Sequence, residues 1–288
     1  MKLFKRSNFL RNVVTLMSGT IIAQSLPLAI SPILSRLYTP EDFGLLALFL
    51  SFANVFGAIA TARYEMAILI PKSEKDAKSI VMLSFIIALG MSLILFVIIL
   101  LFNHTISKWL GNEEIAPWLY WVPVTVLGIG IYNTLTYYNN RKKDFKNIAH
   151  SKVIKSTTQV AVNLGFPYIK PGPAGLITGQ ILGFWTGSLR LFKKVKNELL
   201  DLKNISKQDI KRVQKQYKDF PKFSMPSILA NVLSQNLTNI ITAVLFNSAT
   251  LGLYSFANRI LGAPTAIAGQ SIGQVFMNEA SEHRKKNR

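Results

Sequence analysis

Apolar runs of about twenty residues, separated by short polar segments, recur along the whole chain. Runs of this length cross the hydrocarbon core of a bilayer as helices, at a rise of about 1.5 Å per residue. The pattern predicts eight membrane-spanning helices, at approximately 12–35, 43–70, 79–102, 117–138, 152–169, 173–192, 224–246 and 250–277. We therefore predict an all-α, polytopic membrane helical bundle.

The first apolar run is roughly 22 residues long, whereas the apolar region of a secretory signal peptide has about 7 to 15. We expect it to remain in the protein as a membrane anchor. Composition agrees with a membrane protein, since 50% of the residues are hydrophobic and only 16% are charged, against about 25% charged in soluble domains.

Motifs for catalysis or cofactor binding do not occur in the sequence. The chain has no cysteine, which excludes disulfides, thiolate metal sites and cysteine nucleophiles. Its three histidines are far apart, and neither an HExxH motif nor a Gly-rich phosphate loop is present. We expect a protein that is not an enzyme and that holds no metal or cofactor.

The net charge of +19 reflects topology. Arg36, Lys108 and Lys170 fall on one side of the predicted membrane, Arg63 and Arg259 fall within spans, and the other 28 of the 33 Lys and Arg residues fall on the opposite side. By the positive-inside rule, both termini are cytoplasmic in a multi-pass protein of the cell membrane. The basic charge is then explained without a nucleic-acid partner.

The longest connection between spans is strongly basic and contains one predicted helix. Ser206 and Asp209 have the spacing of a capping box, and Ile210, Val213 and Tyr217 fall on one face. Such a helix suits the anionic inner surface of a membrane. A solvated linker helix explains the same pattern.

An internal repeat is visible at an offset of 208 residues. "LYTPEDFGLLALF" at 37–49 aligns with "LFNSATLGLYSFA" at 245–257, so that Gly44 pairs with Gly252. Each copy lies between two predicted spans. Spans one and two therefore correspond to spans seven and eight, and one lobe of the protein has six helices.

The repeat divides the chain into a first six-helix lobe at 1–192, a cytoplasmic basic linker at 193–222 and the first two helices of a second lobe at 223–288. A complete second lobe requires four more helices. We expect the chain to be a truncated or fragmentary open reading frame.

Polar residues recur at helical spacing within five of the spans, where they are costly unless they face a cavity or another helix. Hydrogen bonds between helices explain any one stripe, but five stripes together favour a polar cavity. The candidate substrate-binding or gating residues are Asn54, Arg63, Glu65, Asn133, Asn163, Asn231, Gln235, Arg259 and Gln270.

Arg63 and Glu65 are the charged residues of the second span. Residues two apart are separated by about 200° around a helix, so we expect no ion pair between them. Glu65 completes the polar stripe, and Arg63 turns to another helix or to the headgroups. With the deeper Arg259 there are two arginines against one carboxylate, which favours an anionic ligand such as a lipid pyrophosphate over an organic cation.

Three stretches resemble a known family: "RLYTPEDFG", "ARYEMAILIPKSEKDA" and "GLYSFANRILGAPTAIAGQSIGQVFMNEAS". They look like the signature segments of bacterial polysaccharide biosynthesis proteins, the O-antigen and capsule flippases of the Wzx type, which are similar in fold to MATE-like exporters. The resemblance implies two lobes of six helices and the movement of undecaprenyl-pyrophosphate-linked oligosaccharide units to the outer leaflet by alternating access. Arg63, Glu65 and Arg259 are the matching positions that it suggests as cavity or gating residues.

The partners implied are a lipid-linked oligosaccharide, membrane lipids and other polysaccharide assembly proteins. One alternative is a MATE-like cation-coupled drug exporter, which needs cavity carboxylates, and only Glu65 is available. A membrane glycosyltransferase or polymerase is another, with Glu41, Asp42, Glu113 and Glu114 as its acidic residues. A purely structural membrane scaffold is the third.

Overall fold

The computed structural model describes residues 2–200, 205–258, 261–262, 273 and 276. Every regular element in these ranges is helical. The longer helices are α1 (Lys2–Ala29), α3 (Pro40–Ile59), α5 (Glu74–Trp109), α7 (Val122–Arg141), α8 (Phe145–Gly165), α9 (Ala174–Leu200), α10 (Lys207–Gln216) and α11 (Met225–Leu245). The shorter ones are α2 (Ser31–Leu37), α4 (Tyr64–Ala67), α6 (Ala116–Leu119), the 3-10 turns η1 (Glu113–Ile115) and η2 (Phe166–Tyr168), and the π-helical turn η4 (Phe220–Ser224). Residues 248–258 are also helical.

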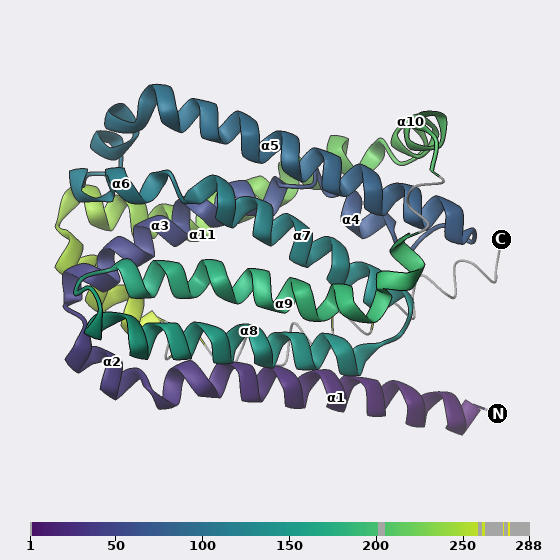
Figure 1. The fold of residues 1–288 in the computed structure, drawn as a ribbon, viewed down its shortest axis with the longest axis horizontal. Coiled ribbons are helices and arrows are strands. Elements are labelled where there is room, and N and C mark those ends of the chain that lie inside the picture. The colour runs from purple at the N-terminus through teal and green to yellow at the C-terminus, as the bar shows by residue number, and fades with distance from the viewer. Residues whose placement is uncertain (1, 201–204, 259–260, 263–272, 274–275, 277–288) are drawn as a thin grey trace.

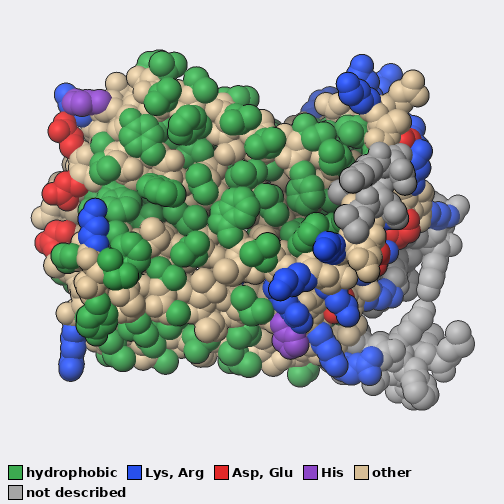
Figure 2. All heavy atoms as spheres, in the orientation of Figure 1, with side chains coloured by type: hydrophobic (Ala, Val, Ile, Leu, Met, Phe, Trp, Pro, Cys, Tyr) green, Lys and Arg blue, Asp and Glu red, His purple; other side chains and the backbone are tan. Residues whose placement is uncertain are grey.

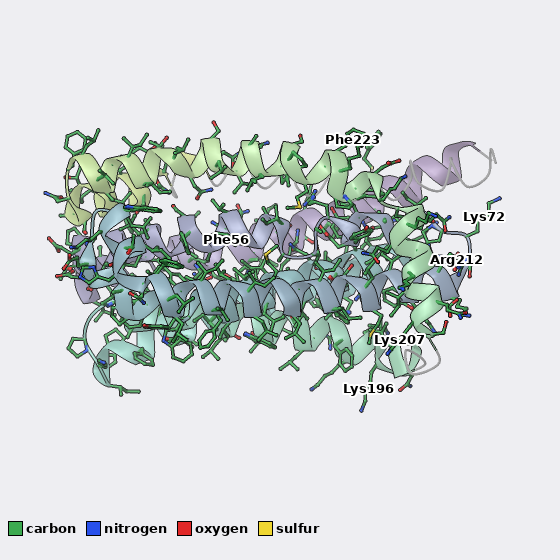
Figure 3. All side chains as sticks on the ribbon, turned by 90° about the horizontal axis from the view of Figure 1, so that it is seen from above. Phe56, Lys72, Lys196, Lys207, Arg212 and Phe223 are labelled. Carbon is green, nitrogen blue, oxygen red and sulfur yellow. The ribbon has the colours of Figure 1, made fainter. Side chains whose placement is uncertain are left out.

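The long helices lie side by side along one axis (Figure 1). The order α1, α8, α9, α7, α5 forms one layer, and α3 packs behind α7. α11 crosses α3 on the side away from this layer (Figure 3). The predicted all-α membrane bundle is confirmed.

The two ends of the bundle differ in charge (Figure 2). We call "the basic end" the one that holds the start of α1, residues 60–73, residues 141–146 and α10. We call "the far end" the one that holds residues 36–39, 109–121, 166–173 and 246–249.

Within the described part of the chain, four helices are long and apolar enough to cross a membrane: Arg11–Leu37, Pro40–Ile59, Glu74–Trp109 and Phe220–Leu245. The bent pair Glu113–Leu119 and Val122–Arg141, with 53° between its parts, makes a fifth if it crosses as one span. α8 and α9 match the predicted spans 152–169 and 173–192 and run beside these helices, but they do not reach the same apolarity. Most of the predicted span 250–277 lies outside the described residues. Four or five of the eight predicted spans are thus supported.

Glycines let α9 approach α8 closely. They recur every fourth residue, at Gly175, Gly179, Gly183 and Gly187, and Gly179 and Gly183 lie directly against α8. A Cβ at Gly183 would lie 3.0 Å from the carbonyl oxygen of Lys155. Lipid tails are as apolar as leucine, so the hydrophobic effect does not drive membrane helices together as it does helices of a soluble protein. Close packing of small residues holds membrane helices together instead.

Candidate functional site

The chain breaks its helix just after α3. α3 ends at Ile59, well before the predicted end of that span at residue 70. Ala62 and Arg63 follow in the left-handed region, with φ of 49° and 65°. Residues other than glycine rarely adopt this region, at a cost of about 1 to 3 kcal/mol each, and such strain gathers at functional sites. α4 then starts in a new direction.

Arg63 and Glu65 form an ion pair across this break, and the expectation that they could not pair is wrong. Nη1 of Arg63 lies 3.2 Å from Oε1 of Glu65, whose side chain is only 2% exposed. The separation of 200° holds on a continuous helix, whereas here a left-handed residue lies between α3 and α4. Thr61 donates a hydrogen bond to the second carboxylate oxygen of Glu65. Thr61, Arg63 and Glu65 therefore form a hydrogen-bonded cluster around a buried carboxylate.

Arg141 holds the broken segment against α7. Its guanidinium donates to the carbonyl oxygens of Ile68 at 3.1 Å and Pro71 at 2.7 Å, and it pairs with Glu74 at 3.1 Å. Carbonyls that have no helical partner after the break are thereby satisfied. The sequence analysis counted Arg141 only as a topology signal and missed this role.

A polar cavity of about 330 Å³ lies among α3, α8, α9, α11 and residues 255–256. Its polar lining consists of amides and hydroxyls, and Asn239 donates to Ser51 across it at 2.9 Å. No charged side chain lines it among the described residues. The lining residues are Phe43, Leu46, Ala47, Leu50, Ser51 and Asn54 of α3, Gln159 of α8, Gln180 of α9, Asn236 and Asn239 of α11, and Ser255 and Phe256.

Of the seven predicted site residues that the structure describes, only Asn54 lines this cavity. Asn163 is buried between α8 and α9. A Cβ added to Gly179 of α9 would strike its side-chain oxygen, so its amide packs directly against the neighbouring helix. Asn231 and Gln235 are exposed on α11 and hydrogen-bond each other at 2.8 Å. Asn133 is half-buried in α7.

Arg259 and Gln270 lie outside the described residues. The cavity residues that the sequence analysis missed are Asn236 and Asn239, together with Gln180 and Ser51. The two asparagines are three residues apart, a spacing that places them on one helix face and could have revealed them.

α8 carries a polar stripe in which Asn147, Ser151, Lys155, Gln159 and Asn163 follow one another at intervals of four residues. The Nζ atom of Lys155 lies 3.2 Å from the centroid of the Phe184 ring and 5.2 Å from that of Tyr132. Aromatic faces stabilise such a cation, more strongly where water is excluded. The charge count places Lys152 and Lys155 on the basic side of the membrane although the predicted span 152–169 contains both, and both lie within α8.

The two copies of the repeat meet at the far end. A Cβ added to Gly44 would strike the carbonyl oxygen of Ser248, and one added to Gly252 would strike that of Pro40. Pro40 and Ser248 differ by the same 208 residues as the two glycines, so the contact is reciprocal, as at a two-fold interface. Asn112 donates a hydrogen bond to the Ser248 hydroxyl beside it.

The helix starts are also equivalent. Thr39 accepts a hydrogen bond from the backbone N–H of Asp42, and Asn247 accepts one from that of Thr250. Both pairs keep the offset of 208 and are N-caps. The geometry agrees with the predicted repeat.

α10 docks on the protein at the basic end. Val213 is fully buried and Tyr217 is 9% exposed, both within the core formed with Tyr64 and Ile80. Asp209 pairs with Lys75 of α5 at 2.8 Å. The apolar face predicted to suit a membrane surface or solvent therefore packs against α4 and α5.

A family model described as "Polysaccharide biosynthesis protein" matches residues 33–288. No curated protein and no solved structure matches the chain. The matched range covers the break after α3, the cavity helices and the reciprocal glycine contact. The chain is thus a membrane protein that belongs to the polysaccharide biosynthesis protein family.

Proposed function

We propose that this protein is a flippase, which moves an undecaprenyl-pyrophosphate-linked oligosaccharide from the cytoplasmic to the outer leaflet of the cell membrane by alternating access. The observation that carries the proposal is the polar cavity that α3, α8, α9, α11 and residues 255–256 line. Its amides both donate and accept hydrogen bonds, as sugar hydroxyls do. This chemistry suits a neutral glycan better than an ion.

The orientation follows the positive-inside rule, which makes the basic end cytoplasmic. The contact between Gly44 and Gly252 then closes the outer side of the path. Substrate enters from the basic end and leaves after this contact has separated. In this account the protein transports and catalyses no reaction, it acts as a Wzx-type flippase, and it works with polysaccharide assembly proteins.

The two main alternatives receive less support. A cation-coupled exporter needs a carboxylate in the cavity, but Glu65 is paired with Arg63 at the basic end. A glycosyltransferase needs acids beside the sugar, and the described lining of the cavity has none.

A translocation assay in proteoliposomes tests the proposal. Vesicles contain a fluorescent undecaprenyl-pyrophosphate-linked oligosaccharide in both leaflets, and a membrane-impermeant reductant bleaches the outer leaflet. Without transport about half of the label is protected, because only one leaflet is accessible. We expect the protein to expose the protected label and Asn239→Leu to slow this at least ten-fold.

Asn231→Leu is the matched control, since it changes the same residue type on the exposed side of the same helix. We expect it to transport at the wild-type rate. Two results would contradict the proposal. In one, half of the fluorescent lipid stays protected from the reductant although wild-type protein is present; in the other, Asn239→Leu and wild type translocate at equal rates.

A further inference from the structure

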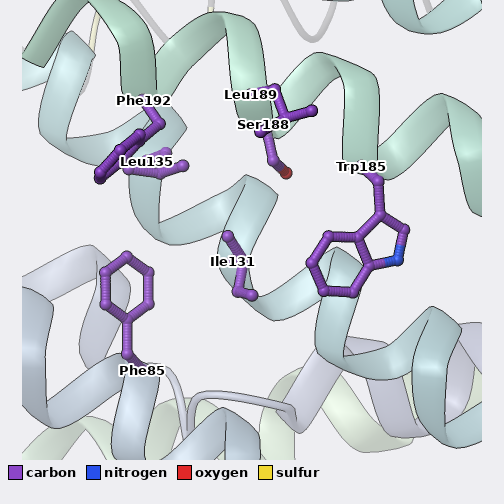
Figure 4. Close-up of a pocket in the computed structure, with 7 residues that line it drawn as sticks. All are labelled: Phe85, Ile131, Leu135, Trp185, Ser188, Leu189 and Phe192. Carbon is purple, nitrogen blue, oxygen red and sulfur yellow. The ribbon is translucent and has the colours of Figure 1, made fainter. Parts of the chain in front are cut away.

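A second, apolar groove lies between α5, α7 and α9. It encloses about 230 Å³. Figure 4 shows α7 at its floor, Phe85 of α5 on one side, and the α9 side chains on the other. The lining residues are Phe85, Ile131, Leu135, Trp185, Ser188, Leu189 and Phe192.

The groove opens onto surface that faces lipid in a membrane. Leu189 at its edge is 57% exposed, and Ile86 and Leu89 beside Phe85 are 47% and 50% exposed. Hydrophobic side chains cover the face of the bundle that Figure 2 shows. α3 and the polar cavity lie behind α7, so the groove is outside the proposed path of the glycan.

Lysines continue both walls of the groove toward the basic end. On α9, Lys196 follows Trp185, Leu189 and Phe192 at helical spacing and therefore lies on the same face. Figure 3 shows its side chain pointing away from the bundle. On α5, Lys78 precedes Phe85 by seven residues, or two turns.

At the end of the floor helix, Lys142 pairs with Glu74 at 3.0 Å and with Glu198 at 2.7 Å. Lys78 and Lys196 add positive charge at the mouth of an apolar groove, and basic pockets between transmembrane helices on the cytoplasmic side bind anionic lipid headgroups.

We propose that this groove is a binding site for an anionic glycerophospholipid of the bilayer. One acyl chain lies among Phe85, Trp185 and Phe192, and the phosphate lies between Lys78 and Lys196. The long lysine side chains reach the headgroup depth while their methylene stems cover the apolar wall. This proposal does not depend on the proposed transport activity.

Trp185 reports directly on occupancy of the groove. The variant Trp109→Phe/Trp118→Phe/Trp121→Phe leaves Trp185 as the single tryptophan. Reconstituted into phosphatidylcholine vesicles, this protein is titrated with dibrominated phosphatidylglycerol, whose bromines quench tryptophan on contact. We expect saturable quenching at a lower lipid fraction than with dibrominated phosphatidylcholine.

Replacement of the lysines tests the headgroup part of the site. Lys78→Gln and Lys196→Gln should each weaken the apparent phosphatidylglycerol affinity about five-fold, since a basic residue near the surface contributes about 1 kcal/mol with anionic lipid. Lys146→Gln is the control, an exposed lysine at the same end on α8, and should leave the affinity unchanged. Far-ultraviolet circular dichroism confirms folding in each case.

Three results would overturn the proposal. Equal quenching by the two brominated lipids would show that the groove does not select an anionic headgroup. Unchanged affinity in Lys78→Gln/Lys196→Gln would remove the assigned phosphate contacts. Absence of Trp185 quenching by any brominated lipid would show that acyl chains do not enter.

Discussion

Arg63 and Glu65 show how a single pair of residues departs from a regular helix. Their types and positions are evident from the sequence, and so is the cost of placing charge in a membrane. The break is not evident, because neither Ala62 nor Arg63 favours a left-handed conformation and no glycine or proline marks the turn. Tertiary contacts hold the segment that follows it, among them the bonds from Arg141 to the carbonyls of Ile68 and Pro71.

Arg63→Ala should destabilise the protein by about 3 kcal/mol, because it leaves Glu65 buried without its charge partner. Arg63→Met/Glu65→Gln should recover much of this loss, since no buried charge then remains. Thermal unfolding of the purified protein in detergent measures both. The control is Arg36→Ala, an exposed arginine at the far end, which should stay within about 0.5 kcal/mol of wild type. If Arg63→Ala matches this control, the buried pair does not contribute as described.

Gly44→Ala tests the reciprocal contact. In most exposed helix positions this change stabilises by up to about 1 kcal/mol, but here the added methyl group meets the carbonyl of Ser248. We expect it to separate the far-end helices and to lower the yield of chemical cross-linking in an Asn112→Cys/Ser248→Cys background several-fold. Gly90→Ala is the control, because a Cβ there meets open space. A cross-linking yield as high in Gly44→Ala as in this control would mean that the contact does not hold the end closed.

α10 illustrates what a pattern predicts about a helix and what it omits. The spacing of Ser206 and Asp209 predicts its start, and both bonds of the capping box are present. The apolar stripe predicts an amphipathic helix. Such a stripe can lie on a membrane surface or pack against the rest of the protein, and the pattern does not distinguish the two. Complementary charges on α5, Asp76 for Arg212 and Lys75 for Asp209, select the protein surface.

Docking of α10 should weaken as the pH falls into the acid range. The hydrogen bond from Lys75, reinforced by Ser206, lowers the pKa of Asp209 to about 2. A carboxyl whose pKa is lowered in the folded state stabilises that state above its unfolded pKa of about 3.9, and this contribution is lost as the pH falls toward 2. An environment-sensitive fluorophore on Lys215→Cys should therefore report a docked helix down to about pH 4 and release below it.

Asp209→Asn should weaken docking at pH 7 and flatten the acid transition of the fluorophore signal, because Val213, Tyr217 and the Arg212–Asp76 pair still hold the helix. Asp219→Asn, a nearby acid between α10 and α11, should leave the acid transition unchanged. Release of wild-type α10 above pH 5 would show that another group controls its docking.

For the bundle as an assembly, sequence reasoning predicts the helical class, the membrane environment and the repeat. It does so because apolar run length and loop charge depend on the bilayer and little on packing detail. The cavity is harder to predict. Asn54 lines it and Asn163 does not, although both lie in polar stripes, because only the packing of neighbouring helices decides whether an amide meets open space or a carbonyl.

The proposed transport requires the far-end contact to open in each cycle. The chain has no cysteine, so Asn112→Cys/Ser248→Cys places two unique thiols at the hydrogen-bonded pair beside Gly44 and Gly252. A short, reducible bis-thiosulfonate reagent joins them, and the translocation assay is run on the same vesicles before and after reduction. We predict arrest in the cross-linked protein and recovery to the uncross-linked rate on reduction. Undiminished translocation by fully cross-linked protein would contradict the account.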